Sequence, residues 1–190
     1  MFGLLGQIGL TTLRLVIILI LTGICVQDFR SYSISWIYFP LLGLSFGLLG
    51  YFNGKVQILD IMKNILSIIG FLLLQGLLLS LYFSVKHRAW TNITRKLLGW
   101  GDILFLLAIS FYLSLLNYIL FYVFSLALSI VFWGSLNVFR KMNNRLPQNQ
   151  IPLAGLQSSL MILCLVFVWG TGKINLSSDA WLMTYFAKLG

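Results

Sequence analysis

The chain has 190 residues, of which 59% are hydrophobic and only 9% are charged. A soluble domain keeps about a quarter of its residues charged, so this composition excludes an ordinary water-soluble globular protein. The net charge of +9 comes from 13 Lys and Arg against four Asp. These cations lie in short loops between apolar runs, which excludes nucleic acid as the expected partner and favours a lipid bilayer with anionic head groups.

Apolar runs follow one another along the chain and predict an all-α, polytopic membrane protein with about six transmembrane helices. The first run is expected to remain as a span and not to be cleaved as a signal peptide, because no cation precedes Arg14. The second run contains Gly43 and Gly47, a small-residue pair suited to close helix packing. We find no repeat or linker, so residues 1–190 are expected to form one domain. The expected spans are 10–26, 36–52, 65–85, 102–116, 118–139 and 153–169.

Residues 103–139 form a run of 37 residues without a charge. As one helix this run would be about 55 Å long, at about 1.5 Å per residue. The hydrocarbon core of a bilayer is only about 30 Å thick, so the run must fold back. We predict the turn at residues 114–117.

The distribution of cations predicts the orientation of the spans. Six spans place residues 27–35, 86–101 and 140–152 on one side, and these loops carry eight cations against five elsewhere. The positive-inside rule assigns the eight to the cytoplasm and both termini to the outside. The eight are Arg30, Lys86, Arg88, Arg95, Lys96, Arg140, Lys141 and Arg145.

The four acidic residues fall into two classes. Asp60 lies beside cations in an expected outer loop and Asp179 lies in the C-terminal tail, so both are interpreted as solvated loop charges. Asp28 closes the first span and Asp102 opens the fourth, so both are expected at the cytoplasmic face. A carboxyl group at a span edge indicates function, although Asp102 alone could equally be a helix cap.

Two carboxyl groups held close together share a proton, because both cannot ionise. One then activates a water as general base while the protonated partner polarises a carbonyl group. Gly99 and Gly101 beside Asp102 permit a sharp turn and close approach of a substrate. Cys25 and Cys164 are interpreted as buried apolar residues and His87 as a loop residue. With these donors so scattered, we expect no metal site and no cofactor.

The segment Gly99-Trp100-Gly101-Asp102 resembles the G-x-G-D motif of type IV prepilin peptidases and archaeal preflagellin peptidases, and more distantly of presenilins. In that family the first aspartate begins the pattern D-x-R-x-x-x-I-P-N, which Asp28, Arg30 and Ile34 match. The resemblance implies Asp28 and Asp102 as the catalytic residues, with Gly99, Gly101 and Arg30 in support.

The chain departs from the family at several positions. Ser35 and Trp36 replace the usual Pro-Asn, and Leu104 replaces a frequent Lys. Residues 151–155 resemble a third family motif, an Ile-Pro followed by a Gly-Pro segment, but lack its second proline. The chain also lacks the cysteine-containing N-terminal region that many bacterial relatives carry, so we expect no methyltransferase activity.

The resemblance implies an aspartic-type endopeptidase that removes the short basic leader of prepilin-like precursors at the cytoplasmic face of the cell membrane. Two alternatives remain open. One is a catalytically silent relative that acts as a membrane assembly factor. The other is a small transporter that uses Asp28 and Asp102 as ion or proton ligands, although we find no inverted repeat of the kind such proteins show.

Overall fold

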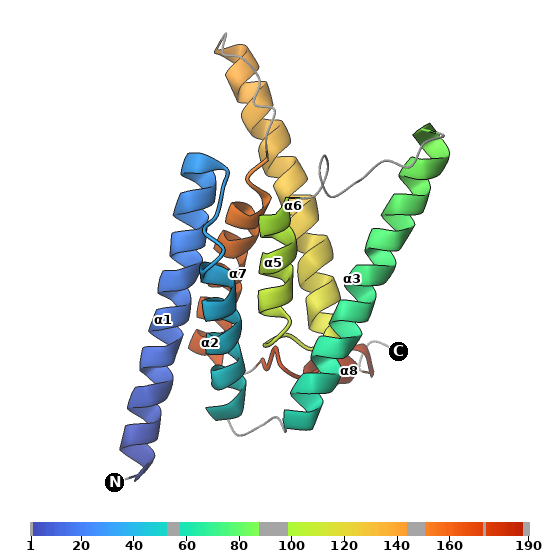
Figure 1. Ribbon diagram of the computed structural model, residues 1–190. Coiled ribbons are helices and arrows are strands. Elements are labelled where there is room, and N and C mark those ends of the chain that lie inside the picture. Colours follow the sequence, from blue (N-terminus) through green and yellow to red (C-terminus); the bar gives the residue numbers. More distant parts are fainter. Residues whose placement is uncertain (1, 53–57, 88–98, 144–150, 173, 188–190) are drawn as a thin grey trace.

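The computed structural model describes residues 2–52, 58–87, 99–143, 151–172 and 174–187, and within these ranges the chain is helical with no strand. The expected all-α class is therefore confirmed. Figure 1 shows the longer helices running alternately up and down, with both termini near the same end of the bundle. The described helices are α1 (Phe2–Ser31), α2 (Tyr38–Phe52), α3 (Ile58–His87), α5 (Trp100–Ile109), α6 (Leu115–Met142), α7 (Leu153–Thr171) and α8 (Ala180–Ala187).

Three of the described helices are long and apolar enough to cross a membrane, which is fewer than the six expected spans. They are the part of α1 from Gly6 to Ser31, α6 and α7. Shorter apolar helices of 10–17 residues occur at Tyr38–Phe52, Met62–Leu78 and Trp100–Ile109. At about 1.5 Å per residue, the 10 residues of α5 extend only about 15 Å, roughly half of a hydrocarbon core.

The long apolar run folds back as expected, but earlier than predicted. The turn lies at residues 110–114, between the end of α5 and the start of α6, and not at 114–117. The expected span 102–116 is therefore too long at its C-terminal end. The short helix α8 was not predicted at all.

Helix α2 packs against α5 and the turn that follows it through a small residue and aromatic rings. A Cβ added to Gly43 of α2 would lie 3.3 Å from the ring of Phe111 and 3.8 Å from the Cα of Ala108. Gly43 thus lets α2 approach α5 closely, as the small-residue pair predicts. Phe46 of α2 stacks on Tyr112 with 5.1 Å between ring centroids. These contacts help to set the position of α5, and therefore of Asp102, along the axis of the bundle.

Asp179 is not the solvated loop charge that its position predicts. It is half-buried, and its Oδ1 accepts a hydrogen bond from Ser114 Oγ at 2.5 Å. Asn117 Nδ2 donates to Ser114 Oγ at 2.7 Å and to the carbonyl of Leu176 at 3.1 Å. This network anchors the C-terminal segment to the turn before α6, so Asp179 has a structural role at the end of the bundle opposite to Asp28.

The remaining predictions concern Asp60 and two expected loops. Asp60 lies in the first turn of α3 and not in a loop, although its side chain is not described. Most of the expected loops 86–101 and 140–152 lies outside the described residues. The cations that lie outside the described residues are Lys55, Arg88, Arg95, Lys96, Arg145, Lys173 and Lys188.

Candidate functional site

The N-terminus of α7 holds the first aspartate. Asp28 lies in the last turn of α1, and its side chain is buried, with 7% of its surface exposed. The backbone N–H of Gly155, in the first turn of α7, donates to Asp28 Oδ2 at 2.6 Å. The first N–H groups of a helix have no partner within that helix, and they carry its positive dipole end. Asp28 therefore caps α7 from a different helix.

The second aspartate is held by the same helix end. Asp102 is half-buried in the first turn of α5, and the backbone N–H groups of Ala154 and Gly99 face its carboxyl group. The backbone N–H of Asp102 donates in turn to the carbonyl of Gly99 at 3.1 Å. The Asp102 carboxyl group facing the N–H of Gly99 corresponds to one half of a capping box, because Gly99 has no side chain to supply the other half. The N–H of Ala154 is the additional link that ties α5 to α7.

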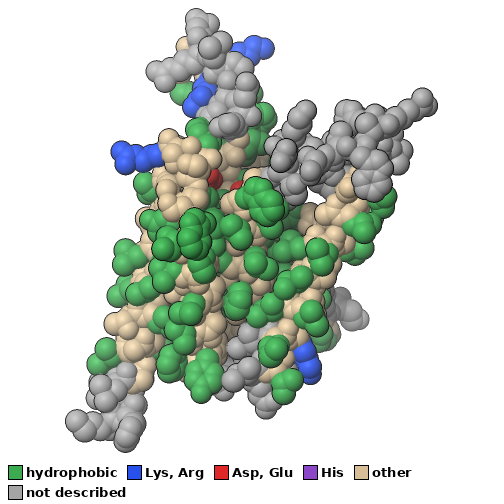
Figure 2. Space-filling model, in the orientation of Figure 1, with side chains coloured by type: hydrophobic (Ala, Val, Ile, Leu, Met, Phe, Trp, Pro, Cys, Tyr) green, Lys and Arg blue, Asp and Glu red, His purple; other side chains and the backbone are tan. Residues whose placement is uncertain are grey.

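The fold brings together the carboxyl groups of Asp28 and Asp102, which lie far apart in the sequence. Ala154 and Gly155 are adjacent in α7. The backbone N–H of Ala154 faces Asp102, and that of Gly155 donates to Asp28. The carboxyl groups are close enough for the charge of Asp28 to act on Asp102. The acidic atoms visible in Figure 2 gather in one small area, near the end of the bundle away from the N-terminus. The pairing that the sequence predicts is therefore present in the fold.

Gly155 is required by the close approach of α1. A Cβ on this residue would lie 3.1 Å from the Cβ and Oδ2 of Asp28 and 3.1 Å from the ring of Phe29. Any side chain at position 155 would push α1 and the Asp28 carboxyl group away from the α7 amides. The sequence gives only a faint signal for this role, the echo of a third family motif at residues 151–155.

The two glycines of the Gly99–Asp102 segment have separate roles. A Cβ on Gly99 would lie 3.0 Å from Asp102 Oδ2, so a side chain at this position would require the carboxyl group to shift. A Cβ on Gly101 would lie 3.4 Å from Cδ1 of Ile34. Ile34 belongs to the segment after Asp28, so the two sequence motifs pack against each other in the fold.

The chain turns away from α1 directly after Asp28. The backbone N–H of Tyr32 donates to the carbonyl of Asp28 at 3.0 Å, and Tyr32 itself adopts a left-handed conformation with φ of 50°. Ser35 then bonds twice to Gln27, through its backbone N–H to Oε1 and through its Oγ from Nε2, both at 3.1 Å. These two bonds hold Ser35, in the segment after Asp28, against the end of α1.

Other candidate residues lie outside the pair. Arg30 is exposed in the last turn of α1, and Trp36 has 72% of its surface exposed. Leu104 is half-buried against the hydrophobic core. Cys25 and Cys164 are half-buried and form no disulfide bond. Among the residues that the structure describes, no group of three His, Cys, Asp or Glu side chains is placed to hold a metal.

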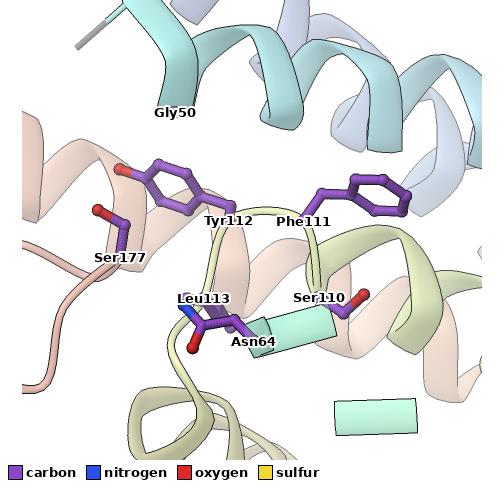
Figure 3. A pocket seen from close by; sticks show the side chains of 7 residues that line it. All are labelled: Gly50, Asn64, Ser110, Phe111, Tyr112, Leu113 and Ser177. Carbon is purple, nitrogen blue, oxygen red and sulfur yellow. The ribbon is translucent and has the colours of Figure 1, made fainter. Parts of the chain in front are cut away.

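A small pocket lies at the other end of α5, away from the aspartates. Figure 3 shows it lined by residues 110–113 of the turn before α6, together with Gly50, Asn64 and Ser177. None of these residues is charged, and the pocket borders the network that anchors the C-terminal segment. It is a structural feature of that end of the bundle and does not overlap the aspartate pair.

Comparison with known proteins gives no relative. No protein-family model, no curated protein and no solved structure matches the chain. The geometry of the aspartate pair and the sequence motifs around it are therefore the basis for a functional proposal.

Proposed function

We propose that the chain is a membrane aspartyl endopeptidase similar to the type IV prepilin peptidases. One observation carries the proposal. Asp28 and Asp102, from distant parts of the chain, interact with each other while adjacent amides of α7 hold one carboxyl group each. The structure describes the side chains of three of the four aspartates, and of these three it brings Asp28 and Asp102 together. The proposed substrate is a precursor with a short basic leader followed by an apolar helix.

The chemistry requires one proton shared between the two carboxyl groups. The ionised aspartate removes a proton from a water, whose oxygen attacks the carbonyl carbon of the scissile bond. The protonated aspartate gives its proton to the carbonyl oxygen, and a tetrahedral diol forms. The amine nitrogen then takes a proton from one aspartate while the other takes a proton from a hydroxyl of the diol. The C–N bond breaks, the acid and the amine leave, and the original protonation state of the pair returns. The α7 amides keep the carboxyl groups in place throughout, because they belong to a rigid helix.

The proposal places the pair at the cytoplasmic face of the cell membrane. The alternating directions of α1, α2, α3, α5, α6 and α7 support six traversals, with both termini on the opposite side (Figure 1). Arg30 follows Asp28, and Arg140 and Lys141 lie in the last turn of α6. Cations at these helix ends favour the cytoplasm. A basic leader would meet the aspartates as it leaves the lipid.

Topology is open to a direct test. Reporter fusions placed after Asn92 and after Asn144 should both report the cytoplasm, because six traversals put both positions on the side of the aspartates. A fusion at the C-terminus should report the outside. An external signal from either internal fusion would contradict the six-span arrangement and remove the basis for cleavage at the cytoplasmic face.

The proposed activity is tested with purified protein and a prepilin-type peptide that has a basic leader, a glycine and an apolar segment. We expect cleavage with a bell-shaped dependence on pH, because both the fully protonated and the fully ionised pair lack one catalytic role. The two limbs belong to the pair and not to either residue. A chelator should leave the rate unchanged. Turnover that requires a metal, or a flat profile from acid to neutral pH, would rule out the aspartyl mechanism.

A further inference from the structure

A buried polar cluster lies between α6 and α7, less than one turn along α7 from the amides that hold the aspartates. Gln157 of α7 has none of its surface exposed, while Ser125 and Ser129 of α6 have 1% and 2% exposed. Gln157 Nε2 donates a hydrogen bond to Ser125 Oγ at 3.3 Å. Buried polar groups of this kind normally find partners, in the protein or in ordered water.

The hydroxyl of Ser125 fixes the orientation of the Gln157 amide. Ser125 Oγ donates its only proton to the carbonyl of Tyr122 at 2.9 Å, so it can only accept from Gln157. The nitrogen of the amide therefore faces Ser125. Ser129 Oγ donates to the carbonyl of Ser125 at 2.7 Å. Gln157 Oε1 is buried and has no hydrogen-bond partner in the described part of the chain.

The unpaired oxygen lies near the level of the aspartates. Gln157 follows Ala154 and Gly155 by three and two residues, so its Cα lies about 3–5 Å further along the axis of α7. Side chains on a helix lean toward its N-terminus, which brings the amide back toward the two backbone N–H groups. At about 100° per residue, Gln157 and Gly155 flank Ala154 on opposite sides, facing α6 and α1 respectively.

We infer that Gln157 is a positioning residue whose Oε1 holds a buried water beside α7, on the Ala154 and Asp102 side of the aspartate pair. Water is the smallest molecule that supplies the missing donor, and buried waters occupy sites where polar groups would otherwise be unpaired. The proposed hydrolysis consumes a water, and the burial of Asp28 within the bundle restricts access of bulk water to the pair. The use of this water in catalysis rests on the proposed peptidase function, whereas the water site itself does not.

The water site has a test that is independent of activity. A high-resolution experimental structure of the wild-type protein in lipid should show a water within hydrogen-bond distance of Gln157 Oε1. Gln157→Met has a side chain of similar length without an acceptor, and its structure should lack this water. If the oxygen of Gln157 instead meets a protein donor and the site is dry, the inference is overturned. A protein that holds the water but cleaves no prepilin-type peptide would overturn the peptidase function alone.

Kinetics of the active protein test the positioning role. Gln157→Met should lower kcat by roughly 10- to 100-fold and leave KM within about two-fold, because a misplaced water slows the chemical step and not binding. Ser129→Ala is the matched control and should retain the wild-type kcat, since its hydroxyl bonds only to its own helix. Gln157→Glu puts a third carboxyl group beside the pair and should move the pH profile upward. Unchanged profiles in both Gln157 variants, with wild-type kcat, would contradict the role.

Discussion

Asp28→Asn and Asp102→Asn should each abolish cleavage of a prepilin-type peptide, and the double variant should be no worse than either single one. General acid–base catalysis contributes roughly 10²- to 10⁴-fold, and groups that act as a unit lose their whole contribution when one is removed. Initial rates of the three purified variants and the wild type, measured with one peptide at one pH, give the comparison.

The asparagine variants also separate catalysis from a plain capping role. Asp28 accepts a hydrogen bond from the N-terminus of α7 and Asp102 faces the same helix end, and a carboxylate there stabilises a helix whatever its chemistry. Asparagine is about as good a helix cap as aspartate, so thermal stability should change little. It offers no general base and no acidic proton. Folded but inactive variants therefore indicate catalysis, whereas folded and active ones would leave the aspartates as caps only.

Two further aspartates serve as controls for the same assay. Asp60→Asn should retain wild-type activity, because Asp60 lies on α3, outside the helices that form the pair. Asp179→Asn should also cleave, since an asparagine Oδ1 can accept from Ser114 as the carboxyl group does. An inactive Asp60 variant beside an active Asp28 variant would disprove the pairing. The transporter alternative predicts a different result, because its aspartates would bind ions without any cleavage.

The sequence predicts the helical class and the aspartate pair for a clear physical reason. Apolar runs without charge have few alternatives to helices in lipid, and each change of direction brings helix ends back to one face. Asp28 and Asp102 both sit at such ends, so counting the spans between them is enough to place them together. The exact length of a helix is harder to predict, because turns such as residues 110–114 contain no Gly or Pro to mark them.

The contacts that hold the pair could not be predicted from the sequence. Backbone N–H groups leave no mark on residue type, so the roles of Ala154 and Gly155 became visible only with α7 in place. The sequence assigns Asp179 to solvent because it lies in the C-terminal tail, after the last expected span. Its partner, Ser114, lies 65 positions away and is brought to it by tertiary packing.

Gly155→Ala is expected to reduce cleavage at least roughly 10-fold, because the new methyl group enters the space of the first aspartate. Its Cβ would lie 3.1 Å from both Cβ and Oδ2 of Asp28, closer than ordinary van der Waals contact. Asp28 must then move by a few tenths of an ångström, and its bond to the N–H of residue 155 is lost or misdirected. The initial rate with a prepilin-type peptide, compared with the thermal unfolding midpoint, reports both effects.

Gly170→Ala is the matched control, on the same helix but with no atom within 4 Å of the added Cβ. Both substitutions gain about 0.5–1 kcal/mol of intrinsic helix stability, because alanine loses less backbone entropy than glycine. Any difference between them therefore comes from Asp28 and Phe29, which only the methyl group at 155 meets. Gly170→Ala should cleave at the wild-type rate and unfold at the same or a higher temperature. If Gly155→Ala did the same, the close approach of α1 to α7 would not be what positions the aspartate, and the role assigned to the α7 amides would be wrong.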